Sequence, residues 1–478
     1  TANIEATQGA INTPSPLAVA VSVSVAARLD WVTAPASPVT ADDTWTAFTV
    51  EITDAYGNRR TSDTTNITVI EDGTDSFGGT TTRAAVAGVA TFDDITYRTA
   101  ETIDVTGTAA GLADTPDATV VVNPGAATKL VWETAPASPV TADDTWTAFK
   151  VEIQDAWGNR RTADTTNITV VEDGTDSFGG TTTRAAVAGV ATFDDITYRT
   201  AETIDVTGTA AGLADTPDAT VAVQPGAANY FTVAGAGAQT AGTANALTIS
   251  AYDAYDNLCS FGPNNYTGDK SITFSGANAS PLGDDPTATD KAGTATDFGT
   301  GTTVTFTNGV STDGGSMVLY KVETANIEAT QGAINTPSPL AVAVSVSAAT
   351  RLAYVTPPAT PVTADDTWTA FTVEITDAYG NRRTADTTGI TVVEDGTASF
   401  GGTTTVAAVG GLATFNDITY RTAETINVKG TAGGLTDTSD ATITVNPGAA
   451  TKLVWETAPA SPVTADDTWT AFKVEIQD

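Results

Sequence analysis

The sequence predicts an all-β fold, built as a series of tandem β-sandwich domains. Three observations lead to this prediction. The chain repeats itself, its apolar residues alternate with polar ones at the period of a β-strand, and Gly-containing turns separate the alternating segments. The clearest repeat is a string of 34 residues from Val122 to Asp155, which recurs unchanged 323 positions later, from Val445 to Asp478.

A shorter repeat sets the domain size. Equivalent residues lie 101, 101, 121 and 101 positions apart, at Leu29, Leu130, Phe231, Leu352 and Leu453. A spacing of about 100 residues is the commonest size of a single domain. We expect four complete domains in a window on a longer polymer, with three domains to each 323-residue unit. The expected ranges are 1–27 (the last part of a preceding domain), 28–126, 127–227, 228–348 (a longer variant), 349–449 and 450–478 (the first part of a following domain).

Each copy is predicted to contain about seven short strands. In FTVEIT, residues 48–53, three apolar residues alternate with three polar ones, which is typical of a half-buried antiparallel strand. Asp54 and Gly57, which are residue types that favour turns, follow this strand. The other strands expected in the first copy are 28–32, 66–70, 80–86, 88–92, 102–108 and 118–122. Short strands with turns at regular spacing favour a sandwich of immunoglobulin-like architecture.

Several segments of each copy resemble a known class of repeats. The strand end VEITDAYGNRR, the strand GVATFDDITYRTA and the closing ETIDVTGTAAGL are similar to the bacterial Ig-like repeats of invasin and intimin type. The third copy keeps AYDAYDN and NGVST, with extra sequence between them, and resembles a longer variant. The resemblance implies a long prokaryotic surface protein. It implies no activity, because such repeats serve as stalk, spacer, adhesin and fibre alike.

The predicted joints between domains are short. NPGAATKL at 123–130 and QPGAANYF at 224–231 contain Pro and Gly, whereas the junctions before Arg28 and Arg351 lack Pro. Because a linker of a few residues leaves little freedom, we expect beads on a semi-rigid rod.

Composition excludes several classes of function. The net charge of −36 disfavours nucleic acid as a partner. The absence of His removes the commonest general base and zinc ligand, and a single Cys excludes an intrachain disulfide. Paired carboxylates could serve a glycosidase, but here they recur in every domain on predicted turns. We therefore expect no enzyme, no catalytic residue and no required cofactor.

Acidic residues recur at equivalent turns and are candidate calcium ligands, because calcium prefers hard oxygen ligands. Calcium at domain joints would stiffen a rod. The strings lack the spacing of known calcium loops, so solvated turn acids are the competing interpretation. The candidates are Asp42, Asp43, Asp54, Asp143, Asp144 and Asp155.

The turn after the alternating strand carries two further features. The Arg pairs at 59–60, 160–161 and 382–383 are either docking residues for acids on a neighbouring domain or chain, or solvated edge charges. The aromatic residues of this turn have the same two interpretations, docking residue or solvated edge residue. They are Tyr56, Trp157 and Tyr379. The Trp residues beside that strand, in contrast, are expected in the core: Trp45, Trp146 and Trp368.

Four Asn-X-Ser/Thr motifs would accept glycans in a glycosylating host, at Asn66, Asn167, Asn265 and Asn278. The lone Cys259 is expected to be an inert thiol.

Near-verbatim tandem domains favour a mechanical function. One hypothesis is a structural element of an extracellular appendage, in which other copies of the same chain meet at equivalent surfaces. The alternative is the stalk of a cell-surface adhesin, whose binding head would lie outside this sequence and would contact a host or neighbouring cell. Both hypotheses place the protein outside the cell.

Overall fold

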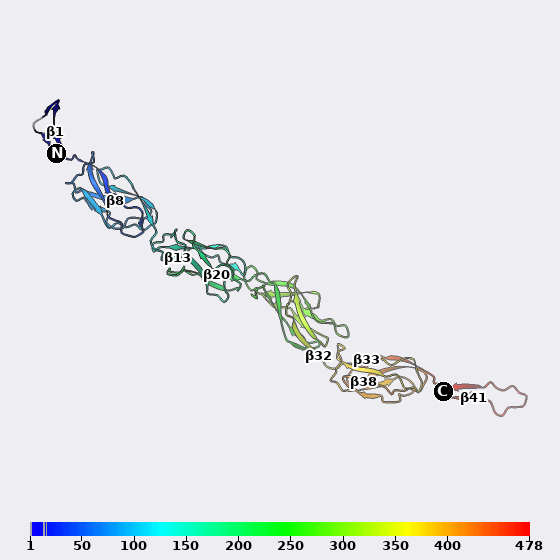
Figure 1. Ribbon diagram of the computed structural model, residues 1–478. Coiled ribbons are helices and arrows are strands. Elements are labelled where there is room, and N and C mark those ends of the chain that lie inside the picture. The colour runs from blue at the N-terminus through cyan, green and yellow to red at the C-terminus, as the bar shows by residue number, and fades with distance from the viewer. Residues whose placement is uncertain (1, 13–14, 16) are drawn as a thin grey trace. The chain divides into compact units, whose positions relative to one another are not determined.

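The structure, a computed structural model, describes residues 2–12, 15 and 17–478. It divides into two compact units, Thr1–Gln224 and Pro225–Asp478 (Figure 1). The residues described form β-strands, turns and loops, and none belongs to a helix. In particular, we find among them no helix that has the length and apolar character needed to span a membrane. The predicted all-β fold is confirmed.

The first complete sandwich has two sheets with the strand orders β10-β7-β5 and β6-β12-β11-β8-β9. Neighbouring strands are antiparallel, except that β6 pairs with β12 in parallel. This arrangement of three and five strands is that of an immunoglobulin-like sandwich. Its strands are β5 (Ala26–Thr33), β6 (Val39–Thr40), β7 (Phe48–Asp54), β8 (Asn66–Glu71), β9 (Thr82–Ala84), β10 (Val89–Phe92), β11 (Thr102–Thr108) and β12 (Ala118–Asn123).

The second sandwich of this unit repeats the first, with sheets β13-β15-β18 and β14-β20-β19-β16-β17. Short strands also pair near the start of the unit, β1 (Ala2–Ile4) with β4 (Leu17–Val19) and β2 (Thr7–Gln8) with β3 (Ile11–Asn12). The strands of the second sandwich are β13 (Lys129–Thr134), β14 (Val140–Thr141), β15 (Phe149–Gln154), β16 (Asn167–Glu172), β17 (Thr183–Ala185), β18 (Val190–Phe193), β19 (Thr203–Thr209) and β20 (Ala219–Gln224).

The second unit begins with the longer variant domain. Its sheets have the orders β21-β24-β29-β28-β25-β31-β32-β22 and β23-β30-β26-β27. Its strands are β21 (Tyr230–Ala234), β22 (Ala238–Thr240), β23 (Ala244–Ala246), β24 (Thr248–Tyr252), β25 (Gly268–Ser275), β26 (Thr287–Thr289), β27 (Ala295–Asp297), β28 (Gly301–Thr307), β29 (Val310–Asp313), β30 (Ser316–Val318), β31 (Thr324–Thr330) and β32 (Leu340–Ser345).

The last complete sandwich returns to the arrangement of the first, with sheets β33-β35-β38 and β34-β40-β39-β36-β37. A hairpin of β41 (Lys452–Thr457) and β42 (Lys473–Gln477) follows it. The strands of the sandwich are β33 (Arg351–Thr356), β34 (Val362–Thr363), β35 (Phe371–Thr376), β36 (Gly389–Glu394), β37 (Thr405–Ala407), β38 (Leu412–Phe415), β39 (Thr425–Thr431) and β40 (Ala441–Asn446).

Each sandwich encloses its own hydrophobic core, and the four cores lie inside the ranges expected for four complete domains. The exact bounds of these domains stay predictions. In the first core Phe48 of β7 stacks on Phe92 of β10, with ring centroids 5.3 Å apart. The three expected core tryptophans are confirmed, with exposed fractions of 4%, 3% and 4% for Trp45, Trp146 and Trp368.

A buried tyrosine fixes the connection between β10 and β11. The Tyr97 hydroxyl donates a hydrogen bond of 2.5 Å to Glu101 Oε1 and accepts one of 3.0 Å from the Asp75 amide. Burial, and then the Glu101 hydrogen bond, raise the pKa of Tyr97 to about 12. Tyr198 and Tyr420 make the same contacts with Glu202 and Glu424.

Replacing Tyr97 by phenylalanine is expected to destabilise the first sandwich by about 1–2 kcal/mol, because the Asp75 amide and Glu101 each lose a buried partner. Hydrogen exchange of the β11 amides measures the effect. Tyr56→Phe, at a side chain that is 85% exposed, is the control. Equal exchange in the two variants would refute the assigned role.

Candidate functional site at the domain joints

One short turn recurs wherever a domain meets its linker. We call residues 155–159, Asp-Ala-Trp-Gly-Asn, and their equivalents the joint turn. Asp155 begins the turn directly after β15 and is 1% exposed. Its Oδ1 accepts hydrogen bonds of 2.9 Å from the amides of Trp157 and Asn159. A buried carboxylate thus organises the turn, as Asp does in an Asx-turn.

The joint turn also binds the linker that precedes its own domain. Asp155 Oδ2 accepts a hydrogen bond of 2.8 Å from the Gly125 amide. Two residues beyond the turn, Arg161 donates from Nη1 to the carbonyl oxygens of Pro124, at 3.1 Å, and Gly125, at 2.7 Å. The amide and both carbonyls of this Pro-Gly linker segment are therefore bound by the domain that follows it.

Asn159 connects the second domain with the first. Its Nδ2 donates to the carbonyl oxygen of Arg98 at 2.7 Å, and its Oδ1 accepts from the amide of Ala100 at 2.8 Å. The same Nδ2 donates to Asp155 Oδ2 at 2.8 Å. Because one amide group bonds both its own turn and the β10–β11 connection of the preceding domain, it fixes one against the other.

Arg98 adds a second contact across this joint. Its guanidinium carbon lies 4.0 Å from the centre of the Trp157 ring, and its Nε donates to Asp42 Oδ1 at 3.0 Å. A cation over an indole ring contributes about 0.5–1 kcal/mol at an exposed site. Trp157, for which the sequence allowed either a docking or a solvent-exposed role, is 46% exposed and contacts Arg98 of the neighbouring domain.

The second unit contains the same kind of joint between its two sandwiches. Asn381 Nδ2 donates to the carbonyl oxygen of Tyr320 at 2.7 Å, and Asn381 Oδ1 accepts from the Val322 amide at 2.9 Å. Asp377 Oδ2 accepts from the Ser347 amide of the linker at 3.2 Å. The same hydrogen bonds therefore form although this linker contains no Pro-Gly pair.

The extra sequence of the variant domain reaches this second joint. A Cβ atom on Gly380 of the joint turn would lie 2.9 Å from Leu282 Cγ and 3.2 Å from Pro281 Cβ. The Tyr379 ring packs on Tyr320, with centroids 4.9 Å apart, and its hydroxyl occupies the space that a side chain at Gly242 would need. The loop around Pro281 therefore supports a contact that the shorter domains make without it.

The variant domain holds its own linker with different residues. Gly226 donates to Asp253 Oδ2 at 2.8 Å, as Gly125 does to Asp155. Where the other domains have the second Arg, this one has Cys259, whose Sγ lies 3.5 Å from the Gly226 carbonyl oxygen. Asn264 Nδ2 donates to the Pro225 carbonyl oxygen at 3.0 Å. A thiol and an amide thus replace one guanidinium, and burial raises the pKa of Cys259 to about 11.

The two Arg residues of each pair have different roles. Arg160 pairs with Glu152 of β15 at 2.5 Å and with Glu133 of β13 at 3.1 Å. Arg161 binds linker carbonyls, as described above. Arg383 likewise donates to the Ser347 carbonyl. The docking hypothesis for these residues therefore needs correction. The second Arg docks onto linker backbone, and the acid paired with the first belongs to the same domain.

Hydrogen bonds to carboxylates predict a loss of stability in acid. Bonds from the side chain and amide of Thr80 lower the pKa of Asp94, and the Tyr97 hydroxyl lowers that of Glu101. Burial raises the pKa of Asp155, but bonds from Asn159, Gly125 and Trp157 outweigh it, so the net shift is downward. A group whose pKa falls on folding stabilises the folded state above its unfolded pKa, and this contribution disappears as the pH falls through the folded value.

We therefore expect the melting temperature to hold from pH 7 to about pH 5 and to fall steeply below about pH 4. Calorimetry from pH 7 to pH 2.5 measures this dependence. Thr80→Val, which removes a donor to Asp94, should make the acid-dependent decrease smaller. A melting temperature independent of pH over this range would contradict the assignment.

Three of the six calcium candidates line one cleft at the first joint. Asp42, Asp43 and Asp155 face a volume of about 420 Å³ together with Gly125 and Trp157. Asp42 binds Arg98, and Asp155 is bonded to amide groups as described, so part of their ligand capacity is already used. In the portion of the chain that the structure describes, no three acidic or Cys side chains form a group able to hold a metal ion.

The remaining calcium candidates lie in equivalent places. Asp54 accepts hydrogen bonds from Ser24, Tyr56 and Asn58, and the Asn58 side chain contributes most to lowering its pKa. Asp143 binds Arg199 at 2.9 Å, whereas Asp144 is exposed. Calcium binding stays a prediction, and calorimetry with calcium and then with a chelator tests it directly.

The four predicted glycan sites differ in their surroundings. Asn66 and Asn167 are exposed at the first residues of β8 and β16. Asn265 is half-buried and donates to Asn308 Oδ1 at 3.2 Å. Asn278 donates to Glu323 Oε2 at 2.8 Å. Glycosylation stays a prediction, and a glycan on Asn66 or Asn167 would displace the fewest contacts.

No protein-family model matches the sequence, and no curated protein matches it. Among solved structures, the chain is similar to FdeC, an Escherichia coli adhesin, at 20% identity over 68% of this chain and 99% of that one, with a TM-score of 0.32. It is similar to invasin, a bacterial integrin-binding protein, at 16% identity over 89% and 82%, with a TM-score of 0.29. The S-layer protein rSbsC gives 14% identity over 90% and 56%, with a TM-score of 0.22.

These likenesses concern the fold alone, and TM-scores below 0.5 carry no argument about function. The proteins include invasin, whose repeats the sequence resembles. The tandem β-sandwich architecture itself is established by the strand orders described above.

Proposed function

We propose that the chain is a non-enzymatic structural repeat region of a long extracellular protein on a prokaryotic cell surface. In this proposal other copies of the same chain assemble with it into a filament or other surface appendage. One observation carries the structural role. In the second sandwich and in the last complete sandwich, the joint turn binds both the linker and the preceding domain, with the same Asn contacts in each unit.

This geometry suits a protein that holds its domains at fixed distances from one another. Both linker and joint are held by hydrogen bonds to buried or half-buried groups, which restrict rotation between the two domains of a unit. The repeated sequence presents the same surface again after 323 residues. If two copies of the chain contact each other at this surface, the same contact can form again at every repeat. Repetition of one contact in this way produces filaments and lattices.

The second candidate is the stalk of an adhesin that reaches a host or neighbouring cell. Each standard domain carries an equivalent exposed ion pair, Arg98 with Asp42, Arg199 with Asp143 and Arg421 with Asp365. Charges repeated on the three standard domains favour a spacer that keeps separate from its neighbours.

Immunogold electron microscopy of the source cells, with antibodies against residues 28–227, tests the proposal. We expect gold particles along extended structures outside the cell, at regular intervals. Label confined to the cell interior would refute the proposal, and label only on isolated thin projections would favour the stalk.

A further inference from the structure

In every complete sandwich, a short strand near the start of the domain lies beside the last strand and runs parallel to it. In the first sandwich this short strand is β6, and Val39 lies opposite Val122 of β12. The Ala41 amide continues the contact, because it donates to the Asn123 carbonyl oxygen at 2.8 Å. We call this contact the terminal pair. In the other sandwiches it joins β14 with β20, β22 with β32, and β34 with β40.

A hydrogen bond just before the short strand extends each terminal pair. In the second sandwich, Ser138 Oγ accepts a bond of 3.1 Å from the Ala222 amide of β20. The variant domain uses backbone instead, and the Gly237 carbonyl oxygen accepts from the Ala343 amide at 2.9 Å. The bonds equivalent to that of Ser138 run from Val121 to Ser37 Oγ, at 3.0 Å, and from Thr444 to Thr360 Oγ1, at 3.1 Å.

The direction of the two strands decides how tension acts on the terminal pair. Tension along the chain pulls the short strand toward its N-terminal end and the last strand toward its C-terminal end. Because the strands are parallel, these two pulls are opposite and run along the strands, so they shear the pair. Shear strains all hydrogen bonds of the pair at once. Two antiparallel strands would instead be pulled at the same end and would separate one bond at a time.

The strand that precedes the pair is held in the same sense. In the second sandwich, β13 forms a parallel bridge at Lys129 with Ala214, which lies shortly before β20. The Leu130 amide donates to the Ala214 carbonyl oxygen at 2.8 Å, and the Ala214 amide donates to the Thr128 carbonyl oxygen at 2.9 Å. A single Cys excludes a disulfide within the chain, so noncovalent contacts alone keep the two ends of a sandwich together.

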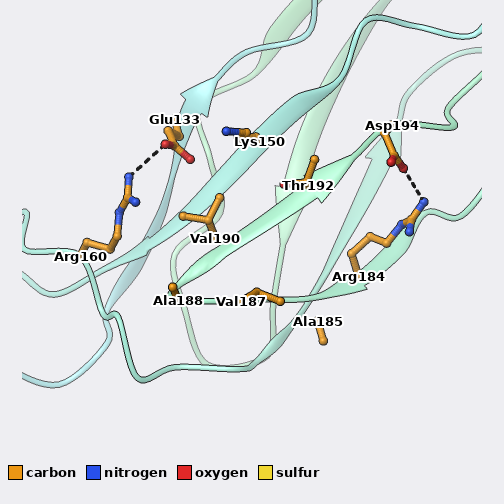
Figure 2. Close-up of a pocket in the computed structure, with 10 residues that line it drawn as sticks. All are labelled: Glu133, Lys150, Arg160, Arg184, Ala185, Val187, Ala188, Val190, Thr192 and Asp194. Carbon is orange, nitrogen blue, oxygen red and sulfur yellow. Dashed lines mark hydrogen bonds and ion pairs between the residues drawn. The ribbon is translucent and has the colours of Figure 1, made fainter.

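Ion pairs elsewhere on the sandwich are poor candidates for this role. Figure 2 shows two of them in the second sandwich, Arg160 with Glu133 and Arg184 with Asp194. Neither joins β14 to β20, and ion pairs between partly exposed groups contribute little to stability. The position of Glu133 is Val32 in the first sandwich, so the first of these pairs is not common to all domains. The terminal pair, in contrast, is present in all four sandwiches.

We propose that the terminal pair is the contact by which each sandwich resists tension, so that the chain withstands pulling between its ends. The inference goes beyond the proposed function, because it concerns a single chain and needs no second copy. Forced unfolding is governed by the rate of unfolding rather than by equilibrium stability. A contact that must break in the transition state sets this rate, whereas contacts that break later leave it unchanged.

Single-molecule force spectroscopy of the 478-residue chain at constant tension tests the proposal. The triple variant removes the hydroxyl acceptor beside each standard terminal pair, and we expect the three standard sandwiches to unfold about 5-fold faster under tension. The variant domain keeps its backbone acceptor and is the internal reference. Its spacing of 121 residues, against 101, identifies it by a longer extension step. The substitutions are Ser37→Ala, Ser138→Ala and Thr360→Ala.

A second triple variant is the matched control, because it removes hydrogen bonds of the same three sandwiches away from the terminal pair. Its substitutions are Tyr97→Phe, Tyr198→Phe and Tyr420→Phe. Denaturant unfolding should show both triple variants folded and less stable than the wild type, and only the hydroxyl variant should unfold faster under tension.

Two results would overturn the inference. If the hydroxyl variant unfolds under tension at the rate of the wild type, the terminal pair is not the resisting contact. If the tyrosine variant is accelerated by the same factor, resistance follows overall stability and no particular contact. Either result leaves the proposed function standing, because microscopy of the source cells tests that function separately.

Discussion

Asp155→Ala is expected to destabilise the joint turn of the second domain by about 3 kcal/mol. The change leaves the amides of Gly125, Trp157 and Asn159 without their acceptor. Hydrogen bonds to a charged group contribute about 1.5–3 kcal/mol each, and an unsatisfied buried donor carries a comparable cost. Amide hydrogen exchange measures this loss of stability at the turn itself. We expect the three amides to exchange about 100-fold faster than in the wild type.

Asp144→Ala is the matched control, because Asp144 is an exposed turn acid of the same domain. It should leave exchange at the joint turn unchanged. Asp155→Asn separates charge from shape, since the amide keeps the size of the side chain but keeps only one acceptor oxygen. If Asp155→Ala exchanged like the wild type, the turn would be held by its backbone alone.

Asn159→Ala is expected to free the second domain from the first while leaving both folded. It removes the bonds to the Arg98 carbonyl and the Ala100 amide, a loss of about 2 kcal/mol at the joint. Spin labels on cysteines placed at Val86 and Val187, which are both 77% exposed, report the distance between the two domains. We expect a narrow distance distribution in the parent and a clearly broader one in the Asn159→Ala variant.

The native thiol does not interfere with this labelling. Cys259 is fully buried, and burial raises its pKa to about 11. Asn66→Ala, at an exposed residue of the first domain, is the control and should keep the narrow distribution. An unchanged distribution in Asn159→Ala would show that the Arg98–Trp157 contact holds the joint without the amide.

The strands were the predictable part of the fold, because alternation identifies any strand long enough to show it. β7, with Phe48, Val50 and Ile52 buried, is the clearest case. β6 was missed for a physical reason. It has two residues, too few to show a period, and its pairing with β12 depends on a strand far along the chain.

The joint was only half predictable. The sequence identified a turn at Asp54 and its equivalents, and the short linkers indicated close domains. It could not show that Asn159 bonds the Arg98 carbonyl of the preceding domain, because that contact is backbone recognition and carries no residue signature. The signal that was available is the retention of Asp and Asn in AYDAYDN, where the Arg pair is lost.

The role of the acidic turn residues was also only partly predictable from the sequence. Their recurrence predicted a common role, and calcium and solvation were the alternatives considered. In the structure several of them accept hydrogen bonds from nearby backbone and side chains, as Asp94 does from Thr80 and Asp155 from Gly125. Residue type and spacing cannot separate a carboxylate that organises a turn from one that binds a cation, because both use the same oxygens.

Electron microscopy of the purified chain, imaged with calcium and again after chelation, tests the central claim of a structural assembly most directly. We predict ordered filaments or sheets whose repeat corresponds to the three-domain unit, and their loss on chelation would assign calcium to the acidic turns. Single thin chains under both conditions, at every concentration tried, would contradict assembly and leave the stalk of an adhesin as the function to pursue.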